Sequence, residues 1–105
     1  MTITVLHIEA CPNWREASDR VRTALTAIGR DDVDVTNVLL SSPEDAAAVA
    51  FAGSPTILID GVDLFPSEGS TADLACRIYR TDSGFAGQPS LSQIENALRD
   101  RLHPR

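Results

Sequence analysis

A cysteine near the start of the chain could carry thiol chemistry. Residues 9–16 read EACPNWRE, so Cys11 is followed by Pro12 and, at the third position, by Trp14. A cysteine at that third position would complete a C-x-x-C redox pair, and Trp14 stands there instead. If Cys11 is redox-active, its partner thiol must come from elsewhere, and Cys76 is the other cysteine of the sequence.

Cys11 is expected at the N-terminal edge of a helix. The spacing of apolar residues predicts a helix over residues 13–28, with Gly29 as a natural stop. Free N–H groups at a helix start favour an anion, so the pKa of the Cys11 thiol should lie below its usual value of about 8.5. The alternative is a buried structural thiol, because free cysteines are often core residues.

The composition limits the classes of function. With 105 residues, 43% of them hydrophobic and 23% charged, the chain is expected to form one globular domain over residues 1–105. Its formal charge of −6 argues against nucleic-acid or anionic-membrane partners, since both are polyanions. All nine basic residues are arginine, which excludes lysine Schiff-base chemistry. Residues 3–8 are too short an apolar run for a signal peptide or a membrane span, so we expect a cytoplasmic protein.

Strands and a short helix are predicted around the first helix. Residues 2–8 are β-branched and almost continuously apolar, which is typical of a buried strand, and residues 34–40 predict a second strand. Ser42 followed by Pro43 is an N-cap with proline at the first helical position, and it predicts a short helix that ends at Gly53.

The second half of the chain predicts a hairpin and further helices. Residues 57–59 and 62–65 flank an Asp-Gly pair, which favours a type I′ hairpin turn. Residues 71–80 have a helical composition, and their apolar side consists of Leu74, Ala75, Ile78 and Tyr79. A capping box predicts a last helix with these apolar residues facing inward: Leu91, Ile94, Leu98 and Leu102.

This order of elements, β-α-β-α-β-β, an insert and then α, resembles the minimal thioredoxin fold. Residues 11–14 (CPNW) follow the first strand as the family's active site does, and residues 53–56 (GSPT) are similar to its cis-proline loop. The resemblance covers residues 2–65 and 90–102. It implies an α/β protein with a four-stranded mixed sheet flanked by helices, and residues 66–89 would add an inserted helical lid before the last helix.

Three positions depart from classical thioredoxins. Trp14 replaces the second motif cysteine, Val5 stands where the family buries an aspartate, and Ala10 stands where an aromatic residue precedes the motif. These changes argue against the usual local dithiol mechanism.

The resemblance also implies a site: catalytic Cys11 and Cys76, and substrate-binding Trp14, Ser54, Pro55 and Thr56. A cis bond before Pro55 would leave the Ser54 backbone free to pair with an extended substrate or a small thiol. In the thioredoxin arrangement the hairpin returns the chain to the rim near Cys11, so Cys76 on the lid helix would resolve an oxidised Cys11. Alternatively, Pro55 is an ordinary trans proline, Trp14 packs in the core, and Cys76 has a packing role.

These residues are compatible with three functions. The first is a thiol–disulfide oxidoreductase without a cofactor, in which Cys11 attacks a thiol or disulfide substrate and Cys76 or an external thiol releases it. Cys11 should then react faster with alkylating agents than Cys76.

The second function is a thioredoxin-fold binding module that captures a soft metal, an organomercurial or a small thiol without redox turnover, with His7 or Asp73 beside the cysteines. No C-x-x-C or H-x-x-x-H spacing supports a metal site. A scaffold that binds a protein partner is a third possibility, which thiol titration would distinguish.

Overall fold

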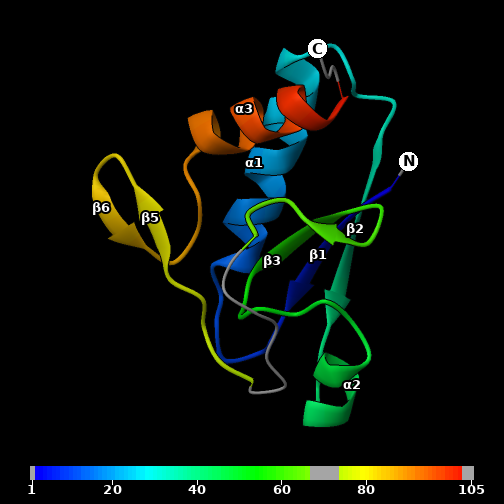
Figure 1. The fold of residues 1–105 in the computed structure, drawn as a ribbon, viewed down its shortest axis with the longest axis vertical. Helices are drawn as coiled ribbons and strands as arrows, with labels where there is room; N and C mark the ends of the chain where they lie inside the picture. The colour runs from blue at the N-terminus through cyan, green and yellow to red at the C-terminus, as the bar shows by residue number, and fades with distance from the viewer. Residues whose placement is uncertain (1, 67–73, 103–105) are drawn as a thin grey trace.

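A four-stranded mixed β-sheet forms the centre of the protein. The structure, a computed structural model, describes residues 2–66 and 74–102. The strands of the sheet are β1 (Thr2–His7), β2 (Asp34–Leu39), β3 (Thr56–Ile59) and β4 (Val62–Asp63), in the order β2-β1-β3-β4 (Figure 1). Strand β1 is parallel to β2 and antiparallel to β3, and β3 is antiparallel to β4. The predicted α/β class, the four strands and their directions are confirmed.

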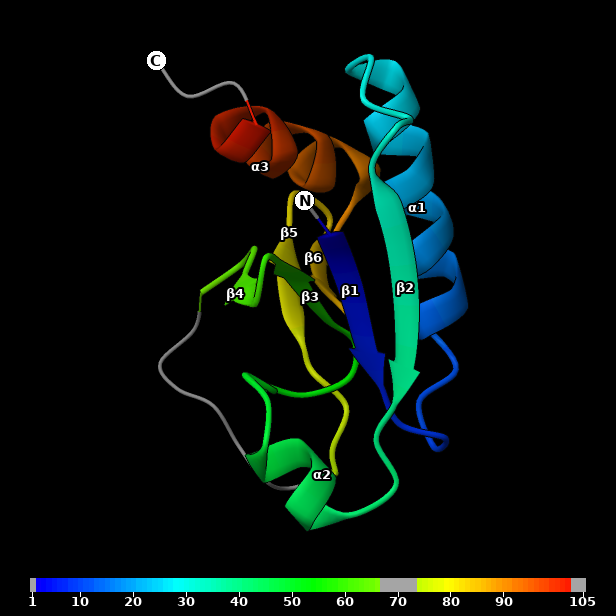
Figure 2. The same cartoon turned by 90° about the vertical axis from the view of Figure 1, so that its right-hand side faces the viewer.

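Three helices accompany the sheet in the described part of the chain: α1 (Trp14–Ala27), α2 (Pro43–Ala47) and α3 (Leu91–Leu102). Helices α1 and α3 pack together on one face of the sheet, whereas α2 lies beyond the carboxyl ends of β1 and β2 (Figure 2). None of the helices within residues 2–66 and 74–102 combines the length and the apolar character needed to cross a membrane.

The buried apolar residues form two clusters. The larger one joins α1, α3 and the sheet, and it includes Val5 and Ile57. The smaller one includes Leu6 and Leu58, which are the neighbours of those two residues along β1 and β3. Because side chains alternate between the two faces of a strand, the clusters lie on opposite faces of the sheet. Cys11 belongs to the smaller cluster, so it lies on the face away from α1 and α3.

The local signals for turns and caps are confirmed. Asp60 and Gly61 both have positive φ, 50° and 84°, as the predicted type I′ turn requires. The backbone of Ser90 donates to Gln93 Oε1 at 2.9 Å, and the Gln93 backbone donates to Ser90 Oγ at 3.2 Å, which completes the capping box of α3. Leu91 is an exception, because it is 38% exposed rather than directed inward.

The predicted helix over residues 71–80 is wrong wherever the structure describes it. Cys76 forms an isolated parallel β-bridge to Ser54. Further along, β5 (Tyr79–Thr81) pairs with β6 (Gly84–Ala86) as an antiparallel hairpin. Strand partners from elsewhere in the chain outweigh the weak helical preference of this segment. The helical lid is therefore replaced, over residues 74–86, by an extended arm; Asp73 lies outside the described residues.

Candidate functional site

The structure joins the two cysteines in a disulfide bond. Cys11 lies in the loop between β1 and α1, three residues before Trp14, and Cys76 lies in the extended segment before β5. Their Cα atoms are 5.9 Å apart across 65 residues of sequence, within the usual range for a disulfide. The two thiols that the sequence suggested as partners therefore meet, but Cys76 reaches Cys11 from an extended arm and not from a helix.

The two halves of the disulfide differ in exposure. Cys11 is 1% exposed and packs among apolar residues of the smaller core cluster, including Leu6, Ile8 and Phe51. Cys76 is an exposed residue. Of the two cysteines, Cys76 is therefore the residue in contact with solvent.

The Ser54 backbone holds the Cys76 segment on both sides of the cysteine. Ser54 N donates to the Ala75 carbonyl and Arg77 N donates to the Ser54 carbonyl, both at 2.8 Å. Ser54 is also tied to the end of β1, because the Ile8 backbone donates to Ser54 Oγ at 3.1 Å. The backbone groups expected to pair with a substrate are thus paired with the protein's own cysteine segment, and a substrate role for Ser54 stays a prediction.

Pro55 and Thr56 continue this loop into β3. The peptide bond between Ser54 and Pro55 is cis. The Thr56 hydroxyl donates to the Gly53 carbonyl and accepts from the Ala52 backbone N–H at 3.1 Å. Thr56 is fully buried, so its side chain fixes the shape of the loop. Contact between Pro55 or Thr56 and a substrate stays a prediction.

Trp14 packs against His7, the last residue of β1. Its ring stacks on His7, with centroids 3.9 Å apart and planes 14° from parallel, and the Arg15 guanidinium carbon is 5.2 Å from the Trp14 ring centroid. Burial, followed by the positive charge of Arg15, lowers the pKa of His7 below its ordinary value. His7 Nδ1 is buried and has no hydrogen-bond partner among the described residues. Packing therefore accounts for Trp14, and its role as a substrate wall stays a prediction.

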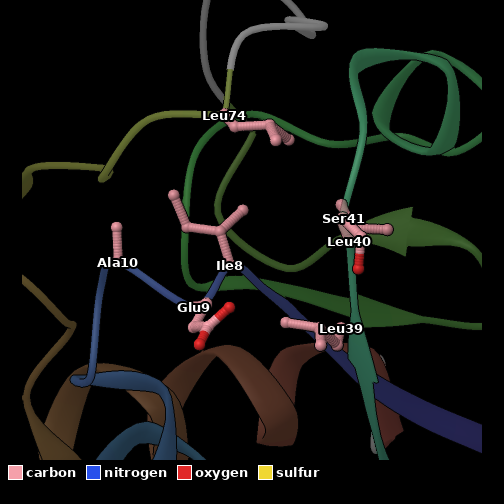
Figure 3. Close-up of a pocket in the computed structure, with 7 residues that line it drawn as sticks. All are labelled: Ile8, Glu9, Ala10, Leu39, Leu40, Ser41 and Leu74. Carbon is pink, nitrogen blue, oxygen red and sulfur yellow. The ribbon is translucent and has the colours of Figure 1, made fainter.

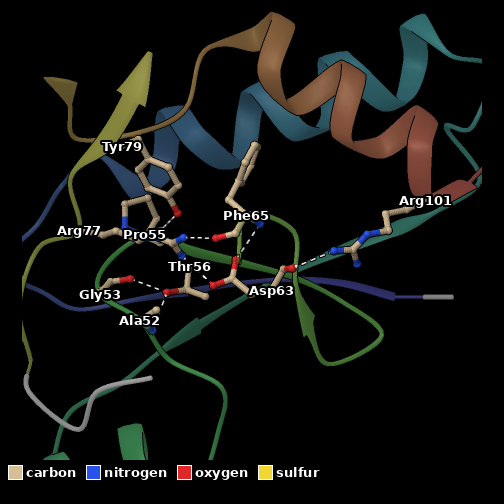
Figure 4. Close-up of polar contacts among 9 residues, drawn as sticks. All are labelled: Ala52, Gly53, Pro55, Thr56, Asp63, Phe65, Arg77, Tyr79 and Arg101. Atoms are coloured by element: carbon tan, nitrogen blue, oxygen red, sulfur yellow. Dashed lines mark hydrogen bonds and ion pairs between the residues drawn. The ribbon is translucent and has the colours of Figure 1, made fainter. Parts of the chain in front are cut away.

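A buried arginine next to Cys76 fastens the arm to the end of the sheet (Figure 4). Arg77 is 8% exposed and pairs with the Asp63 carboxylate at 2.9 Å. The same guanidinium donates to the Phe65 carbonyl and lies 4.5 Å from the centroid of the Tyr79 ring. The loop passes so close that a Cβ on Gly53 would lie 2.7 Å from the Arg77 Cβ. Arg77 is therefore held by Asp63 of β4, by the Phe65 carbonyl just after β4 and by the Tyr79 ring of the arm, while Gly53 of the loop before β3 packs against its backbone and Cβ.

Neither Arg77 nor Asp63 was predicted as a site residue. Single charged residues in an expected helix and an expected hairpin carry no pattern of their own. Gly53, directly before the Ser-Pro pair, was a usable signal, because a loop glycine often marks a close approach of another chain segment.

A cavity of about 240 Å³ opens at the carboxyl ends of β1 and β2 (Figure 3). It is lined by Ile8, Glu9, Ala10, Leu39, Leu40, Ser41 and Leu74. Ala10 directly precedes Cys11, and Leu74 lies two residues before Cys76. The cavity is therefore next to both of the chain segments that the disulfide joins. Its lining is mainly apolar, with Glu9 and Ser41 as polar groups.

Neither a metal-ligand cluster among the described residues nor a known relative assigns a role to this site. Within residues 2–66 and 74–102, no group of three or more histidine, cysteine or acidic residues is placed to hold a metal ion. Compared with protein-family models and with curated proteins, the chain gives no significant match.

Proposed function

We propose that this protein is a thioredoxin-like thiol–disulfide oxidoreductase that cycles the Cys11–Cys76 pair between disulfide and dithiol. The observation that carries the proposal is the pairing of these two cysteines, with Cα atoms 5.9 Å apart, at the loop between β1 and α1. The order of strands and helices and the position of the CPNW motif support the family assignment.

The chemistry needs no group beyond the two sulfurs and a partner thiol. A thiolate attacks one sulfur of the protein disulfide, forms a mixed disulfide with it, and releases the other cysteine as a thiolate. A second thiolate then attacks the sulfur of the partner in the mixed disulfide. The product is a partner disulfide, and the protein takes up protons to become a dithiol. The reverse sequence oxidises the protein and reduces a disulfide substrate.

The cavity beside the disulfide favours a small partner group. Its volume of about 240 Å³ is below the range of roughly 300–1,000 Å³ typical of sites that enclose a whole drug-sized ligand. It has room for a side chain, or for part of a small thiol, while the reacting sulfur lies outside. Thiol or disulfide substrates of low molecular weight, or a cysteine on an exposed protein segment, fit this description.

Turnover of a small disulfide tests the proposal. Bis(2-hydroxyethyl) disulfide and reduced glutathione are mixed with wild-type protein, Cys11→Ser, Cys76→Ser or the double variant, and formation of oxidised glutathione is followed. The wild type should turn over repeatedly, and each single variant should lose at least about tenfold in rate, because both sulfurs take part in the cycle.

Two outcomes would contradict the proposal. Wild-type rates equal to those of the double variant would exclude catalysis. Stoichiometric capture of a mercurial or a soft metal without turnover of the disulfide would identify the protein as a binding module instead.

A further inference from the structure

The asymmetry of the disulfide decides which sulfur an outside thiol can reach. Thiol–disulfide exchange requires the attacking thiolate to contact a sulfur atom directly. Cys11 is 1% exposed, packed in the smaller core cluster and bonded to the arm through Cys76, whereas Cys76 is an exposed residue of that arm. Attack on Cys11 would require the arm to leave its place first.

The arm is held by bonds that do not involve sulfur. On either side of Cys76, the Ser54 backbone pairs with Ala75 and Arg77 at 2.8 Å. Beyond it, the Arg77 guanidinium is buried against Asp63 and Phe65, and the Tyr79 hydroxyl donates to the Pro55 carbonyl (Figure 4). None of these contacts involves a sulfur atom, so breaking the disulfide does not by itself remove them.

From this, and resting on the proposed function, we infer that Cys76 is the sulfur that exchanges with outside thiols and that Arg77 is the positioning residue that keeps Cys11 covered. A partner thiolate attacks the Cys76 sulfur, the Cys11–Cys76 bond breaks, and the electron pair leaves on Cys11 as a thiolate. The partner is then bonded to Cys76, and a second partner thiolate attacks the partner's own sulfur, which releases the partner disulfide and leaves Cys76 as a thiolate. This order reverses the expectation from the sequence, in which Cys11 attacks first.

Trapping the first intermediate of the wild-type protein tests the inference directly. Oxidised protein is mixed with a limiting amount of glutathione, alkylated at once with iodoacetamide, and mapped by peptide mass. Glutathione on Cys76 with an alkylated Cys11 is the expected pattern. Glutathione on Cys11 with an alkylated Cys76 would overturn the inference while leaving the proposed function intact. Absence of any mixed disulfide or turnover would instead count against the proposed function.

Variants with a single cysteine test the role of Arg77. In Cys76→Ser, reaction of Cys11 with oxidised glutathione should be slower in the folded protein than in urea by at least about tenfold, because the arm covers it. In Cys11→Ser, the reaction of Cys76 should be similar in both conditions.

Adding Arg77→Gln to Cys76→Ser should restore most of the lost rate at Cys11, because it breaks the buried pair with Asp63. Arg80→Gln is the matched control, since Arg80 is exposed on β5 and takes part through its carbonyl in the bond from Gln93. Equal rates for the two arginine variants would overturn the role of Arg77. If Arg77→Gln does not fold, Asp63→Asn breaks the same pair from the other side and should give a change in the same direction.

Discussion

Gly53 shows how a single residue controls the docking of the arm. Its φ of +105° already disfavours other residues, and a Cβ there would lie 2.7 Å from the Arg77 Cβ and 3.0 Å from its Cα. Gly61, in the hairpin turn, has a similar conformational constraint with φ +84°, but a Cβ there would have nothing within 4 Å. Substituting Gly61 therefore tests the energetic cost of the backbone conformation alone, whereas substituting Gly53 adds the cost of a steric clash with Arg77.

We expect Gly61→Ala to lower the free energy of unfolding by about 1 kcal/mol, from the left-handed conformation alone. Gly53→Ala should cost about 1–3 kcal/mol more, because overpacking against the arm is added. Urea unfolding of both oxidised variants measures the difference. If both variants lose the same free energy of unfolding, the arm can move aside at little cost and Arg77 is not tightly docked.

Single residues also mark the limit of what the sequence could predict. Cys11, Cys76 and the Ser-Pro pair were identified because their residue types or motif positions carry chemistry. Arg77 and Asp63 were missed because their importance comes from burial and mutual contact, across 14 residues of sequence. A charged residue next to a cysteine looks the same whether it is buried or solvated. Its role becomes visible when the fold places a carboxylate beside it.

At the scale of elements, local patterns predicted most of the secondary structure. The β1–α1–β2–α2–β3–β4 order, the hairpin turn and the capping box of α3 all follow from signals within a few residues of one another. The arm does not. Residues 74–81 have a helical composition, but they are extended in the structure, because Ser54, far earlier in the chain, and β6, later in the chain, supply their backbone partners.

The contact between β1 and α1 should make the stability of the protein depend on pH. His7, at the end of β1, stacks on Trp14 at the start of α1. Its pKa is lowered from 6.5 by burial and then by Arg15. The unfolded chain therefore binds this proton at a higher pH than the folded protein. The stability that His7 contributes is present above about pH 6.5 and is lost as the pH falls through the lower pKa of the folded state.

We expect the free energy of unfolding to fall between about pH 7 and pH 5.5, and His7→Phe to remove a large part of that decrease while keeping an aromatic ring against Trp14. Urea unfolding at both pH values, for both proteins, measures the effect. An identical pH dependence in His7→Phe would show that other groups are responsible.

At the scale of the whole molecule, the disulfide joins parts of the chain that the sheet keeps on one side. The loop before α1, the loop before β3 and the part of the arm around Cys76 meet beside the smaller core cluster, whereas β5 reaches α3 through the hydrogen bond from Gln93 to the Arg80 carbonyl. The arm is also linked to the sheet end that α3 contacts, since Arg101 donates to the Asp63 carbonyl at 3.1 Å. The pairing of the two cysteines is thus set by tertiary structure and not by a local C-x-x-C motif.

The pairing of Cys11 with Cys76 is the central claim, and it has a direct test. The fully reduced protein is treated with about one equivalent of a mild oxidant, and intact mass and peptide mapping follow without further reduction. We expect a monomer lighter by two hydrogens, with the Cys11 and Cys76 peptides linked. A disulfide-linked dimer through Cys11, or a stable glutathione adduct on Cys11 when glutathione is present, would contradict it. Either product would mean that Cys76 does not resolve Cys11.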